Sequence, residues 1–178
     1  MMKCLSFNNI NMSNMSTRST IAIVIKAEDK GRVITPNLDV LGKPINSNFA
    51  NPEFHDTTLE QGVISIYHHW DGYPTGVGAT LLEEFNDYEK VLNLMSFGDA
   101  STINGVDATF YNSWRTGEDW SFTQPKQYEN EDTFTEKFKD DVFIEYLYLF
   151  KDGEWYVKEQ YKDNSDWVKL AEWVDDEA

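Results

Sequence analysis

The sequence predicts an α+β fold: a mainly antiparallel sheet with two central helices packed on one face and a C-terminal β-hairpin. Two short, β-branched apolar runs in the first half of the chain are typical of buried strands. Apolar residues at helical spacing follow in the middle. An Asp-Gly pair between two aromatic runs near the C-terminus indicates a tight hairpin. Strands on both sides of a helical middle favour helices packed on a sheet.

The two strands predicted in the first half span residues 21–25 and residues 63–70. The second is followed by Asp71-Gly72, a typical turn pair, and by Pro74, which cannot donate a hydrogen bond to a sheet ladder. We therefore expect the chain to leave the sheet at this point.

Helical periodicity begins directly after this turn. We expect a first helix, and then a second one that is capped by Asn86 or Asp87 and stopped by Gly98. Their apolar faces predict that both lie on the same side of the sheet. These faces consist of Val77, Leu81, Leu82 and Phe85 in the first helix and of Tyr88, Val91, Leu92 and Met95 in the second.

The remaining segments are shorter. We expect a strand around residues 109–111, a loop over residues 115–128, and a short helix over residues 133–139 with Phe134 and Phe138 facing inward. The hairpin strands, residues 143–150 and 154–161, flank Lys151-Asp152-Gly153, and residues 167–170 form a last short strand or helical turn.

The 178 residues, of which 40% are hydrophobic and 15% aromatic, predict a single domain with a packed core. Residues 1–15 are expected to be a disordered leader, with Met12 and Met15 as alternative starts to Met1. Residues 16–174 form the domain, and residues 175–178 an acidic tail. Residues 28–61, rich in Pro and Gly, are an insertion or arm with room for one short hairpin.

The charge of the chain is its most pronounced global property. It has 31 acidic residues against 15 Lys and Arg, a net charge of −16, which argues against direct binding of nucleic acid. Such a surface attracts basic partners or serves solubility alone. Residues 118–178 carry 18 of the acids and seven Lys or Arg. The candidate acidic interaction face is Glu129, Glu131, Asp132, Asp140 and Asp141.

A candidate ligand site lies at the end of the second strand. Tyr67, His69 and Asp71 alternate and would share one face. Two glycines then enter the first helix, whose exposed amides favour an anion such as phosphate. The same residues also fit a purely structural interpretation, in which Asp71 organises the turn, Trp70 and one His pack in the core, and the glycines allow tight helix packing. The full candidate set is Tyr67, His69, Asp71, Tyr73, Gly76 and Gly78.

No catalytic residue, metal site or cofactor is predicted. The one further histidine, His55, lies in the expected insertion, and two ligands do not make a zinc site. The single cysteine, Cys4, rules out a disulfide within one chain. Because the sequence has neither a secretory signal nor an apolar run of bilayer length, we expect a cytoplasmic protein that does not bind membranes.

Two segments resemble a family of phage- and prophage-encoded proteins whose activity is not established. They are STRSTIA at residues 16–22 and the HWDGY block at residues 69–73. The resemblance extends over most of residues 16–170, and residues 28–61 depart from it because the first two strands of such proteins lie closer together. It implies a phage origin and a place in the host cytoplasm. It implies no catalytic residue.

Two functions are compatible with these observations. The first is a non-enzymatic phage accessory protein that binds and inhibits a host or anti-phage defence protein, with an acidic surface that mimics nucleic acid and meets a basic partner. The alternative is a protein that binds a small molecule, a phosphate or nucleotide, or a small enzyme. It would use Tyr67, His69 and Asp71 beside the Gly76/Gly78 helix start.

Overall fold

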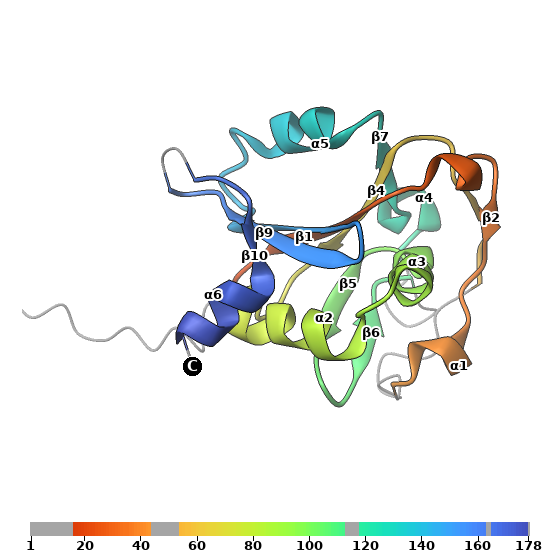
Figure 1. Ribbon diagram of the computed structural model, residues 1–178. Helices are drawn as coiled ribbons and strands as arrows, with labels where there is room; N and C mark the ends of the chain where they lie inside the picture. Colours follow the sequence, from red (N-terminus) through yellow and green to blue (C-terminus); the bar gives the residue numbers. More distant parts are fainter. Residues whose placement is uncertain (1–15, 44–53, 113–117, 163–164, 178) are drawn as a thin grey trace, which may run out of the picture.

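A computed structural model describes residues 16–43, 54–112, 118–162 and 165–177 (Figure 1). The expected leader, residues 1–15, lies outside the described residues. The described chain forms an eight-stranded sheet in the order β10-β9-β8-β1-β4-β5-β6, with β7 also paired to β4. The strands are β1 (Ser19–Val24), β4 (Val63–His68), β5 (Ala100–Ile103), β6 (Ala108–Phe110), β7 (Lys126–Tyr128), β8 (Tyr146–Lys151), β9 (Glu154–Glu159) and β10 (Val168–Lys169).

The sheet is mainly antiparallel, which confirms the predicted α+β class. Strand β1 lies at its centre, antiparallel to β4 and parallel to β8. The pairings of β4 with β7, β5 with β6, β8 with β9 and β9 with β10 are antiparallel, whereas β4 and β5 are parallel. The predicted hairpin is β8–β9, in which Phe150 pairs with Trp155.

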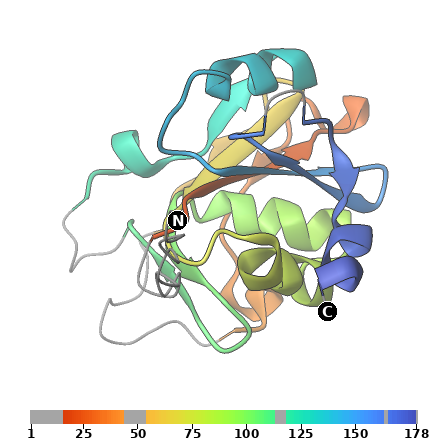
Figure 2. The same ribbon diagram turned by 90° about the vertical axis from the view of Figure 1, so that its left-hand side faces the viewer.

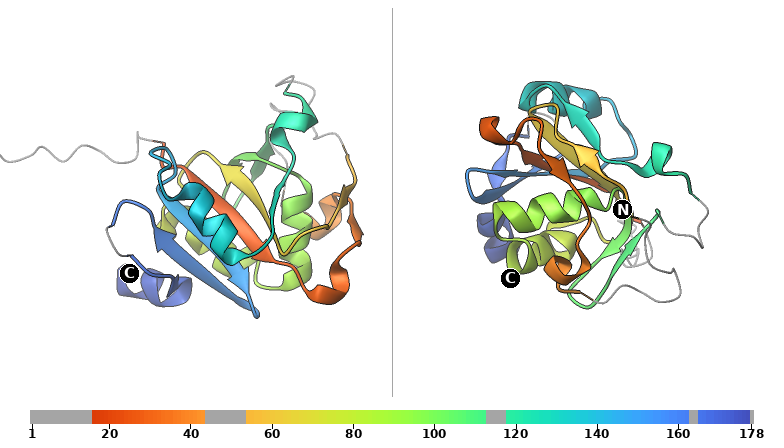
Figure 3. Two further views of the ribbon diagram at one scale, coloured as in Figure 1. Left: turned by 90° about the horizontal axis from the view of Figure 1, so that it is seen from above. Right: turned by 90° about the vertical axis from the view of Figure 1, so that its right-hand side faces the viewer.

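Helices cover both faces of the sheet (Figures 1 and 2). The two central helices, α2 (Ala79–Glu84) and α3 (Tyr88–Ser96), pack on one face as predicted, together with the C-terminal helix α6 (Leu170–Glu177). The helix α5 (Glu131–Phe138) lies over the opposite face, where Phe134 joins a smaller apolar cluster. Seen from above, α5 runs across the sheet (Figure 3).

Local sequence signals set the ends of these elements. The Asp87 side chain accepts the backbone N–H of Lys90 and caps α3, which ends at Ser96 and is followed by Gly98 with φ of 77°. Asn130 caps α5 through the N–H of Thr133. Asp152 and Gly153 both have positive φ, as the type I′ turn of the β8–β9 hairpin requires.

Several boundaries differ from the prediction. Strand β4 ends at His68, two residues early, because Asp71 adopts a positive φ of 57° in the following turn. The prediction of a loop over residues 115–128 was wrong in part. Its described residues contain the short helix α4 (Trp120–Thr123), which is capped by Asp119, and strand β7. Of the expected acidic tail, Asp175 to Glu177 belong to α6.

The segment expected to be an insertion is packed against α3. Strands β2 (Val33–Ile34) and β3 (Thr57–Thr58) form a two-stranded antiparallel sheet, but residues 35–56 separate them in the chain, so no short hairpin turn joins them. The short elements η2 (Ala27–Asp29) and α1 (Leu38–Leu41) flank β2. Arg32 donates two hydrogen bonds to Glu89, at 2.9 and 2.7 Å. Ile34, Leu41 and Leu59 belong to the main core.

Candidate functional site

The sequence-predicted site is only partly assembled. The Tyr67 hydroxyl lies 2.6 Å from Nδ1 of His69, a hydrogen bond between two half-buried side chains. Asp71, by contrast, is exposed in the turn and acts on Tyr73, whose pKa is raised by burial and further by the Asp71 carboxylate. His69 therefore pairs with Tyr67, whereas Asp71 is associated with Tyr73.

The two glycines lie on the other face of the sheet from Tyr67. The segment η4 (Pro74–Gly78) leads into α2, and a Cβ at Gly78 would meet Leu170 at 3.1 Å and Tyr148 at 3.4 Å. A Cβ at Gly76 would lie 2.4 Å from the carbonyl oxygen of Asp71. These glycines allow tight packing and turn closure, so they do not frame one pocket with Tyr67.

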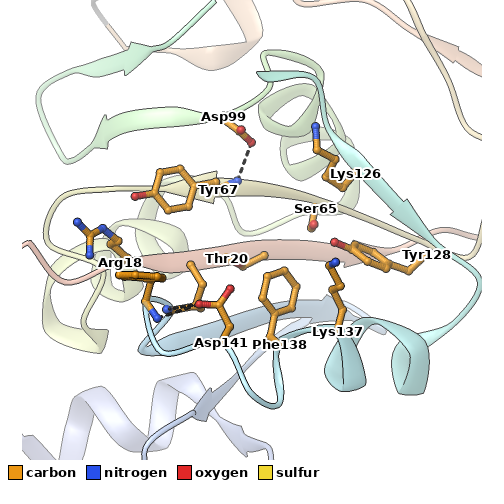
Figure 4. Close-up of a pocket in the computed structure, with 12 residues that line it drawn as sticks. Arg18, Thr20, Ser65, Tyr67, Asp99, Lys126, Tyr128, Lys137, Phe138 and Asp141 are labelled. Atoms are coloured by element: carbon orange, nitrogen blue, oxygen red, sulfur yellow. Dashed lines mark hydrogen bonds between the residues drawn. The ribbon is translucent and has the colours of Figure 1, made fainter. Parts of the chain in front are cut away.

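A different pocket occupies the α5 face of the sheet (Figure 4). Its volume is about 410 Å³, within the range of small-molecule sites. Strands β1, β4 and β7 form the floor, and α5 with the segment that follows it forms the opposite wall. The lining residues are Arg18, Thr20, Ser65, Tyr67, Asp99, Lys126, Tyr128, Lys137, Phe138, Asp141, Phe143 and Ile144.

Three cationic side chains line this pocket. Lys137 follows the buried Phe134 by three residues on α5, so it lies at the edge of the apolar stripe that faces the sheet. Its ammonium points from α5 toward the Tyr128 ring (Figure 4). Lys126 shares a face of β7 with Tyr128. Arg18 directly precedes β1, and its guanidinium lies 5.7 Å from the centroid of the Phe143 ring.

The partners of these cations differ. The Lys126 ammonium donates to the carbonyl oxygens of Gln124 and Phe122 at 3.1 and 3.4 Å. An ammonium has three N–H donors, so a third can bind a ligand. Within the described segments, Lys137 forms no ion pair with a carboxylate. Its neighbour Lys139 is also exposed, but it lies outside the pocket lining and pairs with Glu136 at 3.8 Å.

Two carboxylates accompany the cations. Asp141 Oδ1 accepts the backbone N–H groups of Phe143 and Ile144 at 2.8 and 3.2 Å, which holds the segment after α5 in place. Asp99 Oδ1 accepts the backbone N–H of Tyr67 at 2.8 Å. Burial raises the pKa of Asp99 to about 6, although that hydrogen bond and Lys126 act in the opposite direction. The lining is thus net cationic in a chain of net charge −16.

Aromatic rings form the apolar part of the lining. Tyr67 and Tyr128 come from the sheet, and Phe138 from α5 meets Tyr128 edge to face at a centroid distance of 6.3 Å. Burial raises the pKa of Tyr67, which Arg18 partly opposes, and burial raises that of Tyr128 as well. Both phenols therefore stay neutral and can donate or accept hydrogen bonds.

Sequence reasoning did not identify this pocket, apart from Tyr67 and Asp141. Arg18 is distant in the chain from Lys126 and Lys137, and no spacing in the sequence connects the three cations. The one usable signal was the alternation of Lys126 and Tyr128, which places both side chains on one face of a strand. The composition of residues 115–128 predicts a loop, and a loop gives this alternation no structural meaning.

The predicted acidic face is interrupted by positive charge. Glu129, Asp132 and Asp140 are exposed, but Glu131 pairs with Lys151 at 3.0 Å and Asp141 lines the pocket. Across the described residues, no three His, Cys, Asp or Glu side chains gather in a way that could hold a metal ion. In the same part of the chain, no helix has the length and apolar character needed to cross a membrane.

Comparison of the chain with protein-family models, with curated proteins and with solved structures gave no match in any of the three. The resemblance to phage-encoded proteins therefore stays a prediction, and functional inference depends on the geometry of the pocket.

Proposed function

We propose that this protein binds a small anionic molecule, of the size of a phosphate ester or a nucleotide, in the pocket between α5 and the sheet. The observation that carries the proposal is the convergence of Arg18, Lys126 and Lys137 on one pocket, although the chain has only 15 Lys and Arg among 31 acids.

Electrostatics favours this reading. A strongly acidic protein repels anions at long range, but ionic screening confines that repulsion to about 8–10 Å at physiological ionic strength. Inside the pocket, the nearest charges decide the potential, and these are mainly cationic. An ammonium such as that of Lys137, which has no carboxylate partner among the described residues, gains a charge-assisted hydrogen bond when an anion binds.

The hypothesis of an inhibitor with an acidic, nucleic-acid-mimicking face has weaker support. It depends on the exposed Glu129, Asp132 and Asp140 and on the net charge of the C-terminal third. Lys137, Lys139 and Lys151 lie on or beside the same helix, so the charge pattern there is mixed. Phage origin and a host or defence partner remain hypotheses that a pull-down from host lysate would test.

A thermal-shift series tests the binding proposal, because a ligand that binds the folded state raises the melting temperature. Inorganic phosphate and AMP are compared with uncharged adenosine. We expect AMP to raise the melting temperature with increasing concentration, and adenosine to do so much less. Lys137→Gln should reduce the AMP effect. Lys139→Gln makes the same charge change on the same helix outside the pocket, and it should not.

Two results would contradict the proposal. One is that no anion changes the melting temperature. The other is that Lys137→Gln and Lys139→Gln reduce the AMP effect equally, since this would assign the effect to overall charge and not to the pocket.

A further inference from the structure

The cations of the pocket are not grouped around one point. In Figure 4, the Arg18 guanidinium lies at one end of the pocket, whereas Lys126 and Lys137 lie toward the other end, beside Tyr128. A single phosphate or carboxylate group at either end would leave the cation of the opposite end without a partner.

The register of the sheet gives the scale of this separation. Lys126 pairs with Ser65 on β4. On the other side of β4, Ser19 pairs with His68, and Arg18 lies one residue further out. From Ser65 to His68 the strand advances by three residues, or about 10 Å at 3.3 Å per residue. That span exceeds the reach of one small anion.

The space between the two ends is lined mainly by neutral and aromatic groups. It also contains the Asp141 carboxylate, whose Oδ1 already accepts the backbone N–H groups of Phe143 and Ile144. Thr20 and Tyr67, which pair across β1 and β4, form the floor, and Phe138 contributes an aromatic edge from α5. Figure 4 shows the Tyr67 ring between Arg18 and Lys126. A planar ring or another apolar group fits this middle section, because it needs no charged partner there.

We propose that the ligand is an elongated dianion, with one anionic group held by Arg18, the other by Lys137 and Lys126, and a ring between them. This inference rests on the proposed function and specifies its ligand class. Both phosphates and carboxylates satisfy it, since Arg and Lys bind either group through charge-assisted hydrogen bonds.

Calorimetric titration of the full chain with matched pairs of probes tests the inference. In the first pair, a nucleoside bisphosphate is compared with the corresponding monophosphate. In the second pair, a biphenyl dicarboxylate that has its carboxylates at opposite ends is compared with biphenyl monocarboxylate. We expect the probe with two anionic groups in at least one pair to bind about tenfold more tightly than the probe with one, the effect of one additional charge-assisted hydrogen bond. The pair that shows this preference identifies the source of the charge.

Variants at the two ends provide the controls. Arg18→Gln and Lys137→Gln should each remove the preference for the probe with two anionic groups, while Lys139→Gln should retain it. Because Arg18 also contacts Phe143, the melting temperature of each free variant is measured first, and Lys137→Gln, an exposed position, serves if Arg18→Gln is unstable. If probes with one and with two anionic groups bind equally tightly, and Lys137→Gln weakens the binding of both, the two-ended ligand is overturned while the anion-binding pocket is supported. Absence of binding by every probe would overturn both.

Discussion

The Asp99 carboxylate accepts the backbone N–H of Tyr67 at 2.8 Å, between the part of β4 that pairs with β7 and the part that pairs with β5. Strand β7 pairs with β4 only as far as Ser65, and β5 pairs with it from His68. Asp99 thus substitutes for the missing strand between them. The same opening in the sheet gives the pocket part of its floor, because Ser65, Tyr67 and Asp99 all line it.

Asp99→Asn should change the pH dependence of stability. The pKa of Asp99 is raised to about 6 in the fold against an ordinary 3.8. The stability that this group contributes is therefore present below pH 3.8 and is lost as the pH rises through 6. Asn keeps the acceptor oxygen without the charge. We measure the free energy of unfolding in urea for the variant and for wild type. The difference, variant minus wild type, should be largest above pH 7, where Asp99 is charged, and should fall by about 2 kcal/mol toward pH 4. A difference that does not vary with pH would contradict this.

His68 should act with the opposite sign. Its side chain is fully buried, and Nε2 accepts the backbone N–H of Ile103 at 3.2 Å, so Nδ1 carries the proton toward Ser19 Oγ. Burial lowers the pKa to about 3 from 6.5. Its contribution is therefore present above pH 6.5 and is lost as the pH falls toward 3.

His68→Gln should lower the free energy of unfolding by about 2–4 kcal/mol at pH 7.5, since the variant leaves buried polar groups of Ser19 and Ile103 unpaired. The loss should shrink as the pH falls, because only the wild type carries the acid penalty. Urea unfolding at several pH values measures both effects. A variant as stable as wild type at pH 7.5 would show that the contact of β4 with β1 and β5, through Ser19 and Ile103, does not depend on the His68 ring.

Gly153→Val should destabilise the β8–β9 hairpin by about 1–2 kcal/mol, because Gly153 has a φ of 79° that a β-branched residue resists. No neighbouring atom would obstruct the new Cβ, so the cost comes from the backbone alone. Gly105 is equally open but has no such φ, which makes Gly105→Val the matched control. Equal melting temperatures for the two variants would contradict the role of the turn.

Charge reversal separates the two functional hypotheses. Glu129, Asp132 and Asp140 are exposed, so replacing all three with Lys should preserve the fold. The pocket account expects the triple variant to bind AMP at least as tightly as wild type, because negative charge near the pocket is removed. An acidic inhibitory face would instead lose salt-sensitive association with its basic partner. Reversal of the exposed Glu28 and Glu83 is the control, and weaker AMP binding by the triple variant alone would count against the pocket.

Much of the fold could be predicted because its signals are local. β-branched runs identified β1 and β4, apolar spacing identified α2 and α3, and Asp152-Gly153 identified the hairpin turn. Strands β5 and β7 have four and three residues, too few to show a period, and their pairing with β4 depends on contacts distant in sequence.

The site was less predictable for a related reason. The sequence placed Tyr67 and the glycines side by side, but Gly78 packs against Tyr148 on the opposite face of the sheet. A lysine such as Lys137 looks the same in a sequence whether it faces solvent or a pocket. Only the position of α5 over β4 and β7 gives it a role.

The most direct test of the account is to locate the bound anion by following backbone amide resonances of the full chain during titration with AMP. The account predicts that the largest changes fall on pocket residues, at Tyr67, at Lys126 to Tyr128 and at Lys137 to Ile144, and that Lys137→Gln diminishes them. Changes centred instead on Gly76 and Gly78, or no saturable change at any residue, would contradict the central claim.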